Sequence, residues 1–434
     1  MPPSRRRLLR LLPLLLLCGL ALAWALASLD WCGPWPERPP RVVAEAHGRG
    51  ALRAGAARVA LQPPRPAPGG AGYRPPLPDM EAGPVPLQAR ALVVEAGGAS
   101  VGMVLLDLLS APEPLVAAVR ARVAGLGLQG VLVLATHTHS SMGGYDPRLV
   151  AEVAGMGRYR PELQEVAVVA AARALTEAHG ALAPARLRLG EARAPGLVRS
   201  RSGEEAPDGR LLRAVLQGEH GGIAELLVFS AHPTLVQRHL RTLDPDYPGR
   251  LAREREARGA GVSLVLQGAA GNASAALDGG EDAPGAFAGA LAQLAAGAPL
   301  APVEVAGLDY ARVELALPHP DASRLAPLPL ERAGETLLCR SSLQVAEVGA
   351  LRLGPLHLLA IPGEPTVAAG ERLSGAAGPG TVVLGLGGGY VGYVETPEAV
   401  AGDRGEARRQ YFGPALLERL GAGARLAGRA ARFF

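Results

Sequence analysis

Two histidines, one residue apart, follow an apolar run in the stretch VLVLATHTHSSMGGY, residues 131–145. The run 131–135 is rich in leucine and valine, is too short for a helix and predicts a buried strand. His137 and His139 come directly after it, and residues i and i+2 of an extended chain point to the same side. Both imidazoles could therefore face one point and bind a metal, although two polar loop residues after a strand would give the same pattern.

Three further polar side chains follow apolar stretches that predict strands. They are His232 after residues 224–229, Glu364 after 356–361 and Tyr393 after 381–386. Ligands of open α/β sheets bind beyond the carboxyl ends of the strands, so these side chains are expected to lie together. Two histidines and one carboxylate form a typical catalytic zinc set that leaves room for water. Each of the three also has a simpler interpretation. The histidine could be a polar residue at a strand end, the glutamate could be an acid favoured at a helix N-terminus, and the tyrosine could be a packed aromatic residue.

Predicted strands and helices alternate along the chain, which indicates an α/β architecture with helices covering the sheet. Residues 101–108 and 262–267 predict further buried strands, and residues 113–126 and 161–179 predict helices. No repeat of 20–50 residues is present, and no obvious linker divides residues 58–434. We therefore expect a single large catalytic domain, α/β or α+β, whose strand-end loops form the metal site.

The composition narrows the possible partners of this 434-residue chain. Hydrophobic residues make up 48% of it, which excludes disorder over the whole length. All 44 basic residues are arginine, and 57 glycines and 39 prolines accompany them, which indicates a general compositional bias. The arginines alternate with acids and form no basic stripe interleaved with aromatic residues, so we expect no nucleic-acid partner.

The N-terminal residues 1–32 predict an export segment. Four arginines within the first ten residues precede an apolar run over residues 11–29, which is long enough to span a bilayer if it is not cleaved. The positive flank would stay in the cytoplasm and the remainder would be exported. The alternative is a cleaved signal peptide, with Ala25-Leu26-Ala27 as the site of small residues.

Residues 33–57 are rich in Pro, Arg, Gly and Ala and predict a linker between the export segment and the domain. Cys32 and Cys339 could pair in an oxidising compartment, although two cysteines do not prove a bridge. The domain is therefore expected to be anchored in the membrane, facing the periplasm or the exterior, or to be secreted if the signal is cleaved.

Several motifs stand in a fixed order along the chain: LQARALVVEAGG and VGMVLLDLLS, then ATHTHSSMGGY, AHPT, IPGEPTVAAGERL, and GYVGYVETPEAV followed by YFGPALLE. In order and approximate spacing they resemble the neutral (non-lysosomal) ceramidase family. The resemblance covers residues 58–425. It implies that the chain hydrolyses the amide bond of N-acylsphingosine to sphingosine and a fatty acid, at a membrane surface, with one zinc ion per chain.

The resemblance also implies roles for individual residues. The four zinc ligands of the family correspond to His137, His232, Glu364 and Tyr393. Tyr393 is preferred over Tyr390 because it directly precedes the VETPE segment, as the family's ligand precedes its own threonines. His139 corresponds to a histidine that lies beside the metal and contacts the reacting group.

A family arginine that reaches the site is best matched by Arg199 in VRSRS, with Arg201 as the second candidate. Ser274 holds the serine position of the family's GDVSPN motif, which is GNASAA in this chain, so Asn272 replaces the acid. The family's RYE tyrosine falls at Gly405, and the C-terminal β-sandwich of longer members is not expected. These departures keep the ligand set but weaken the case for ceramide itself.

The implied chemistry is metal-assisted amide hydrolysis. Zinc lowers the pKa of its bound water to about 7, and Arg199 or the Tyr393 hydroxyl stabilises the oxyanion. His139 carries the proton to the leaving amine, and Ser274 orients substrate or water. Two alternatives remain: an amidohydrolase-type metal hydrolase of another amide or ester, and a degenerate lipid-binding domain without activity.

Overall fold

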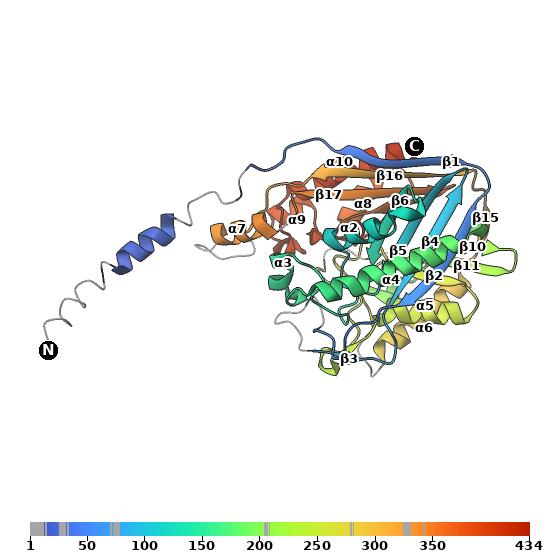
Figure 1. Ribbon diagram of the computed structural model, residues 1–434, viewed down its shortest axis with the longest axis horizontal. Helices are drawn as coiled ribbons and strands as arrows, with labels where there is room; N and C mark the ends of the chain where they lie inside the picture. The colour runs from blue at the N-terminus through green and yellow to red at the C-terminus, as the bar shows by residue number, and fades with distance from the viewer. Residues whose placement is uncertain are drawn as a thin grey trace.

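The computed structural model describes the following residues: 13, 15–25, 32, 34–69, 72, 79–203, 207, 209–277, 280, 282–323, 331–341 and 343–434. Three five-stranded sheets make up the body of this described part, and helices cover the outer side of each sheet (Figure 1). The mixed α/β class predicted from the sequence is therefore confirmed.

The first sheet supplies the strand that precedes the two histidines of the THTH stretch. Its order is β6 (Gly130–Ala135), β5 (Ala99–Leu106), β4 (Gln88–Ala96), β2 (Arg53–Ala60) and β7 (Ala183–Pro184). Strand β6 runs parallel to β5, because α2 (Glu113–Arg122) crosses between them, and the other pairs are antiparallel. The 20-residue α4 (Pro161–Gly180) lies beside α2 on the outer face of this sheet.

The other two sheets have the same mixed character. The second is ordered β13 (Val262–Gln267), β11 (Gly221–Phe229), β10 (Arg210–Gly218), β8 (Arg186–Arg193) and β15 (Ala301–Val303), with α5 (Asp246–Ala257) and α6 (Ala283–Gly297) outside it. The third is ordered β1 (Arg41–Arg49), β16 (Gly307–Ala316), β17 (Val345–Leu353), β18 (Leu356–Ala360) and β20 (Val382–Leu384), with α8 (Val367–Ala377) and α10 (Ala415–Ala430) outside it.

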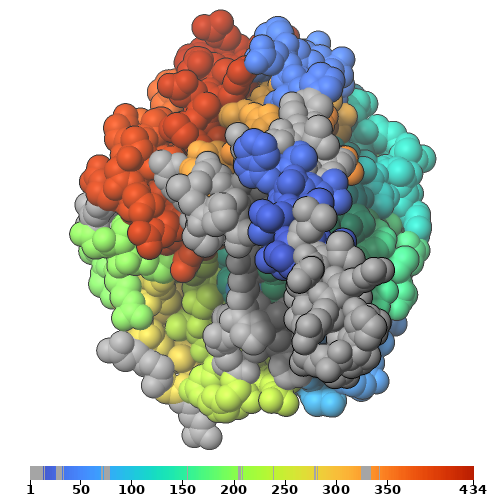
Figure 2. All heavy atoms as spheres, turned by 90° about the vertical axis from the view of Figure 1, so that its left-hand side faces the viewer, coloured from blue at the N-terminus to red at the C-terminus, as the bar shows by residue number. Residues whose placement is uncertain are grey.

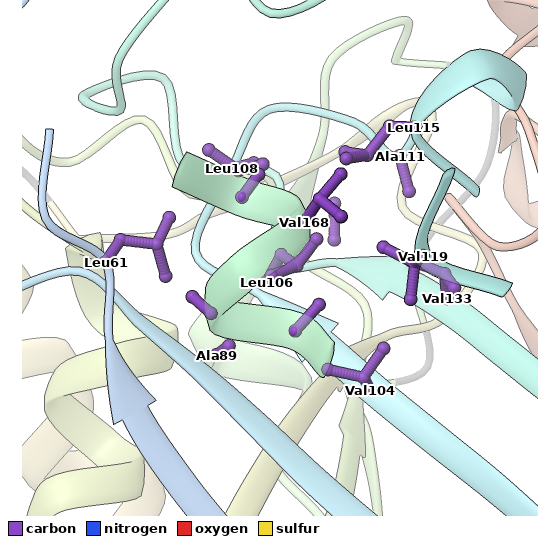
Figure 3. Packing of buried hydrophobic residues seen from close by; sticks show 14 of the residues in the cluster. Leu61, Ala89, Val104, Leu106, Leu108, Ala111, Leu115, Val119, Val133 and Val168 are labelled. Atoms are coloured by element: carbon purple, nitrogen blue, oxygen red, sulfur yellow. The ribbon is translucent and has the colours of Figure 1, made fainter. Parts of the chain in front are cut away.

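The inner faces of the three sheets meet in one apolar core. Strand β5 shows how the sequence builds it, because successive side chains of a strand point to opposite faces. Met103 and Leu105 face this central core, whereas Val104 and Leu106 pack outward against the helices. Figure 3 shows part of the outer layer, in which Leu106 belongs to the same cluster as Val168 of α4.

The single open sheet that strand–helix alternation predicted is replaced by three sheets. The reason is that nine of the twelve neighbouring strand pairs in the described part of these sheets are antiparallel, whereas repeated helical crossovers would give parallel pairs. Strands β4 and β5 meet at Gly97 and Gly98, and both glycines have a positive φ, which suits a tight turn. The turn at Gly354 joins β17 to β18 in the same way.

The linker predicted over residues 33–57 is wrong for much of its length. Strand β1 pairs with β16 of the third sheet, and β2 pairs with β4 of the first. The composition concealed these strands because small alanines and glycines, not large apolar residues, face inward. Ala46 and Gly48 are buried while the arginines at both ends of β1 are exposed.

Short elements surround the ends of the long strands. They are β3 (Glu81–Ala82), α3 (Leu149–Ala151), the π-helical η2 (Glu152–Met156), β9 (Val198–Ser200), β12 (Thr242–Leu243), β14 (Ala273–Ala275), α7 (Glu331–Ser341), β19 (Glu364–Pro365), β21 (Tyr393–Val394) and α9 (Pro397–Ala401). Strands β19 and β21 run parallel, and Glu364 is the register partner of Tyr393. This pairing places two of the expected site residues side by side.

The helix over residues 15–25 lies apart from the three sheets, on the side that faces the viewer in Figure 2. Residues 15–25 are helical, and their leucines and Trp24 are exposed. Part of the expected span 11–29 lies outside the described residues, and within the described ones no helix has both the length and the apolar character needed to cross a membrane. Cys32 and Cys339 are joined by a disulfide, with a Cα–Cα distance of 5.2 Å.

Candidate metal centre

The four expected ligands come from loops that meet where strands of different sheets end. His137 follows β6, His232 follows β11, and Glu364 and Tyr393 open the paired strands β19 and β21. His232 is also held by a bridge to Ser274 of β14, in which its backbone N–H donates to the carbonyl of the preceding Ala273 at 2.9 Å. The fold therefore brings together residues that lie up to 256 positions apart in the sequence.

The polar atoms of these four side chains converge. The Nε2 atoms of His137 and His232 are 3.2 Å apart, and each lies 3.0 Å from Oε2 of Glu364. The Tyr393 hydroxyl lies 3.1 Å from Nε2 of His232. The two imidazoles and the carboxylate are almost completely buried, so bulk water does not supply their hydrogen bonds.

Backbone carbonyls orient both imidazoles. Nδ1 of His137 donates to the Leu109 carbonyl at 2.7 Å, and Nδ1 of His232 donates to the Ala270 carbonyl at 2.6 Å. A neutral ring that donates from Nδ1 carries its lone pair on Nε2, and that atom faces the cluster in both residues. Burial lowers the pKa of His232 to about 4, so this ring is neutral at pH 7.

The carboxylate is ionised in this setting. Burial alone would raise the pKa of Glu364, but positive charge on the side of His137 and His232 holds it well below its usual range, and a cation bound between the three groups acts in the same direction. Its second oxygen, Oε1, accepts a 2.5 Å hydrogen bond from the Tyr390 hydroxyl. Tyr390 is thus a further residue of the site, and the GYVGY stretch contains both Tyr390 and Tyr393.

The donor set fits a zinc ion. Lone pairs of two Nε2 atoms and a carboxylate oxygen point at one another, an arrangement that repels unless a cation lies between them. Tetrahedral zinc with ligand bonds near 2.0–2.1 Å separates its ligand atoms by about 3.3 Å, close to the observed spacings. Two histidines, a glutamate and a tyrosine are therefore able to hold one zinc ion.

The backbone of His137 differs from the extended chain on which the sequence argument relied. Its φ is 69°, in the left-handed region that non-glycine residues seldom adopt, and its N–H donates to the Leu108 carbonyl at 2.9 Å. The ring still reaches the same place as that of His139, since their centroids are 4.9 Å apart and the planes are nearly perpendicular. Uncommon backbone geometry of this kind is found preferentially at functional sites.

His139 lies beside the cluster, not within its shortest contacts. Its ring centroid is 6.2 Å from that of His232. A ring nitrogen of His139 nevertheless lies within 4.8 Å of ring nitrogens of His137 and His232. Burial lowers the pKa of His139 well below its usual value, so the ring is neutral at pH 7.

Arg201, not Arg199, contacts the cluster. Its Nη2 donates to the Tyr393 hydroxyl at 2.9 Å, to the Gly271 carbonyl at 2.8 Å and to Oε1 of Glu406 at 3.1 Å. Arg199, the first candidate from the sequence, is exposed on β9. Strand β9 ends at Ser200, directly before Arg201, and the N–H of Arg201 donates to the Asn272 carbonyl at 2.7 Å. The spacing of residues in the sequence does not reveal where this strand ends.

The structure also accounts for two departures from the family pattern. Asn272 accepts a 3.0 Å hydrogen bond from the N–H of Val367 at the start of α8, a role for which an amide oxygen serves as well as a carboxylate. Gly405 has a φ of 60°, and a Cβ there would lie 2.5 Å from Oε2 of Glu395. A tyrosine at position 405 would therefore require Glu395 to move.

Solved structures with the same fold are known. No family model and no curated relative matches the sequence. The neutral ceramidase of Pseudomonas aeruginosa superimposes with a TM-score of 0.75 at 21% identity, over 88% of this chain and 74% of that one. A structure described as ceramidase complexed with C2 gives 0.74 at 20% identity, over 88% and 75%. The chain therefore has the fold of the bacterial neutral ceramidases.

Proposed function

We propose that this protein is a zinc-dependent hydrolase of lipid amides, in the manner of a ceramidase. The observation that carries the proposal is the convergence of His137, His232, Glu364 and Tyr393 on one point at 3.0–3.2 Å. The shared fold with neutral ceramidases supports the same reaction class.

These four side chains would hold the metal. A bound zinc ion would supply a Lewis acid for the amide carbonyl and would lower the pKa of water. The chain itself contributes the orientation of the ligands. The Leu109 and Ala270 carbonyls fix the two imidazoles, and Tyr390 fixes the carboxylate, which are outer contacts that typically tune affinity and geometry.

Arg201 and His139 are assigned to the reaction itself. Arg201 places a guanidinium on the Tyr393 hydroxyl, where it stabilises negative charge that develops on the carbonyl oxygen of the substrate. His139 lies beside the cluster and is assigned the transfer of the proton from the attacking water to the leaving amine nitrogen. The C–N bond then breaks, and a carboxylic acid and an amine are released.

A second candidate is an amidohydrolase-type site with three histidine ligands. One observation favours this candidate: ring nitrogens of His137, His139 and His232 lie within 4.8 Å of one another. It differs from the first in one respect, because His139 would then be a ligand and not a proton carrier. Zinc content of a variant at position 139 separates the two.

We further propose that the N-terminal segment places the domain at a membrane, outside the cytoplasm. The exposed leucines of residues 15–25 support this, because a surface of that kind favours an apolar environment. Membrane fractionation of the full chain, compared with a chain that lacks residues 1–32, tests it. Equal recovery of both in the soluble fraction would contradict the proposal.

Hydrolysis of a defined panel tests the activity. Purified protein is incubated with N-acyl sphingosines, N-acyl amino acids and lipid esters. Each substrate is tested with the untreated protein, in the presence of a chelator, and after zinc has been added back. Amide cleavage that chelator abolishes and zinc restores is the expected result. Cleavage that is insensitive to chelator, or the absence of cleavage at full zinc loading, would refute the proposed function.

A further inference from the structure

We propose that the site prefers amides whose amine half carries an anionic group, the chemical class of N-acyl amino acids, and that Arg409 binds this group. The inference rests on the proposed amide hydrolysis at the cluster of His137, His232, Glu364 and Tyr393. It adds a binding residue outside the sequence motifs of the site and a substrate class that differs from ceramide, whose amine half is neutral.

Two guanidinium groups flank Tyr393. The Cζ atoms of Arg201 and Arg409 lie 5.8 Å and 5.7 Å from the centroid of its ring. Glu406 connects them: Oε1 accepts from Arg201 at 3.1 Å, and Oε2 accepts from Nη1 of Arg409 at 2.9 Å. The Tyr393 ring is thus bordered by two arginines that share one carboxylate.

Burial separates the roles of these charges. The side chain of Glu406 is 8% exposed and that of Arg201 is 25% exposed, whereas that of Arg409 is 58% exposed. The Glu406 carboxylate is therefore buried below the two arginines, and the charge that solvent can reach beside Tyr393 is the positive charge of Arg409. Among the described residues, the Arg409 guanidinium contacts Glu406 and the Tyr393 ring. A guanidinium has five N–H donors, so Arg409 keeps donors for a ligand.

Other exposed acids of the same segment are already paired. Asp403 accepts from Arg408 at 2.7 Å, and Glu398 accepts from Arg372 at 2.9 Å. Arg409 therefore differs from its neighbour Arg408, whose charge a surface carboxylate balances.

The position of Arg409 beside Tyr393 suits an anionic group on the amine half of a substrate. The Tyr393 hydroxyl belongs to the cluster where the scissile carbonyl reacts, so substituents on the amide nitrogen lie only a few bonds from the Tyr393 ring. A carboxylate or sulfonate on the amine half reaches Arg409 from there and forms a charge-assisted hydrogen bond. A neutral hydroxyl at the same place gains much less.

The test compares amides that share one acyl chain. N-dodecanoylglycine and N-dodecanoyltaurine carry a carboxylate and a sulfonate, and N-dodecanoylethanolamine is the neutral match. We expect the wild-type kcat/KM to favour both anionic amides. Arg409→Gln should lower the ratio of anionic to neutral kcat/KM roughly fivefold to tenfold, mainly through KM. Arg408→Gln, the matched control, should leave that ratio unchanged.

An equal preference for neutral and anionic amides in the wild type, or an unchanged ratio in Arg409→Gln, would overturn the inference. A preference for the carboxylate alone identifies amino-acid conjugates, and a preference for the sulfonate alone limits the class to sulfonated amines. If no amide is cleaved, the proposed function fails. Equilibrium binding of N-dodecanoylglycine and N-dodecanoylethanolamine then decides the inference separately, and equal dissociation constants would contradict it.

Discussion

The Nε2 atoms of His137 and His232 face each other at 3.2 Å inside the protein. Each ring is fixed by an Nδ1–H that donates to a backbone carbonyl, so neither can turn away without breaking that bond. Two lone pairs held together in a buried site are unfavourable unless a cation joins them. This relationship, more than any single motif, supports a metal centre.

The first prediction concerns Tyr390, which holds the second oxygen of Glu364. Tyr390→Phe removes the hydroxyl and keeps the ring, so the fold should survive. Loss of such an outer contact typically lowers metal affinity about 10- to 100-fold. Competition with a zinc chelator measures the affinity. Tyr159→Phe, which loses a hydroxyl bonded to Gln164 at 2.7 Å, is the control and should bind zinc as the wild type does.

The second prediction distinguishes the two arginine candidates. Arg201→Gln should lower kcat about 10²- to 10³-fold, because it removes the positive charge that contacts the Tyr393 hydroxyl, next to the proposed position of the oxyanion. Arg199→Gln should change kcat little, since that side chain is exposed on β9. Steady-state kinetics of both variants on one amide gives the comparison. A greater loss in Arg199→Gln would reverse the assignment.

The third prediction concerns the disulfide between Cys32 and Cys339, which are 307 residues apart. Removing a cross-link of this kind typically destabilises a protein by about 2–4 kcal/mol, because the unfolded chain gains freedom. Cys32→Ser should therefore lower the midpoint of thermal unfolding under oxidising conditions. Cys18→Ser, at a free and exposed cysteine, should not. If both variants unfold at the wild-type temperature, the bridge contributes no stability.

The fourth prediction concerns pH. Burial raises the pKa of Asp246 to about 6, above its ordinary value near 4. The folded state then binds this proton more tightly than the unfolded state, so this carboxyl reduces stability as the pH rises from 4 through 6, by about 3 kcal/mol in all. Asp246→Asn should remove that dependence. Urea unfolding of wild type and variant at pH 4.5 and 7.5 measures it, and parallel pH profiles would contradict it.

Much of the site followed from the sequence because each candidate stands directly after an apolar strand. His137, His232, Glu364 and Tyr393 could be selected in this way, and the fold brings them together. The arginine could not be selected from the sequence. Arg199 lies within β9 and Arg201 directly follows it, and the sequence does not show where this strand ends. Tyr390 acts through the orientation of its hydroxyl, which depends on the tertiary structure.

The fold could be predicted less completely. Alternation of strands and helices gave the correct class, but the antiparallel pairings that divide the strands among three sheets are not visible in hydrophobic patterns. Strand β1 escaped prediction because Ala46 and Gly48 face its buried side, and small residues give no hydrophobic signal. Arg409 and Glu406 carry no motif at all, and their importance depends on the position of Tyr393.

The most direct test of the account is the zinc content of two variants of the THTH stretch. Wild-type protein should bind one zinc ion per chain. His137→Ala should lose zinc and activity together, since it removes one of the converging nitrogens. His139→Ala should keep its zinc while kcat falls about 10²- to 10⁴-fold, because proton transfer is lost. Metal analysis and kinetics on the same preparations give the answer. Equal loss of zinc in both variants would make His139 a ligand, and a wild-type protein that binds no zinc would contradict the metal centre itself.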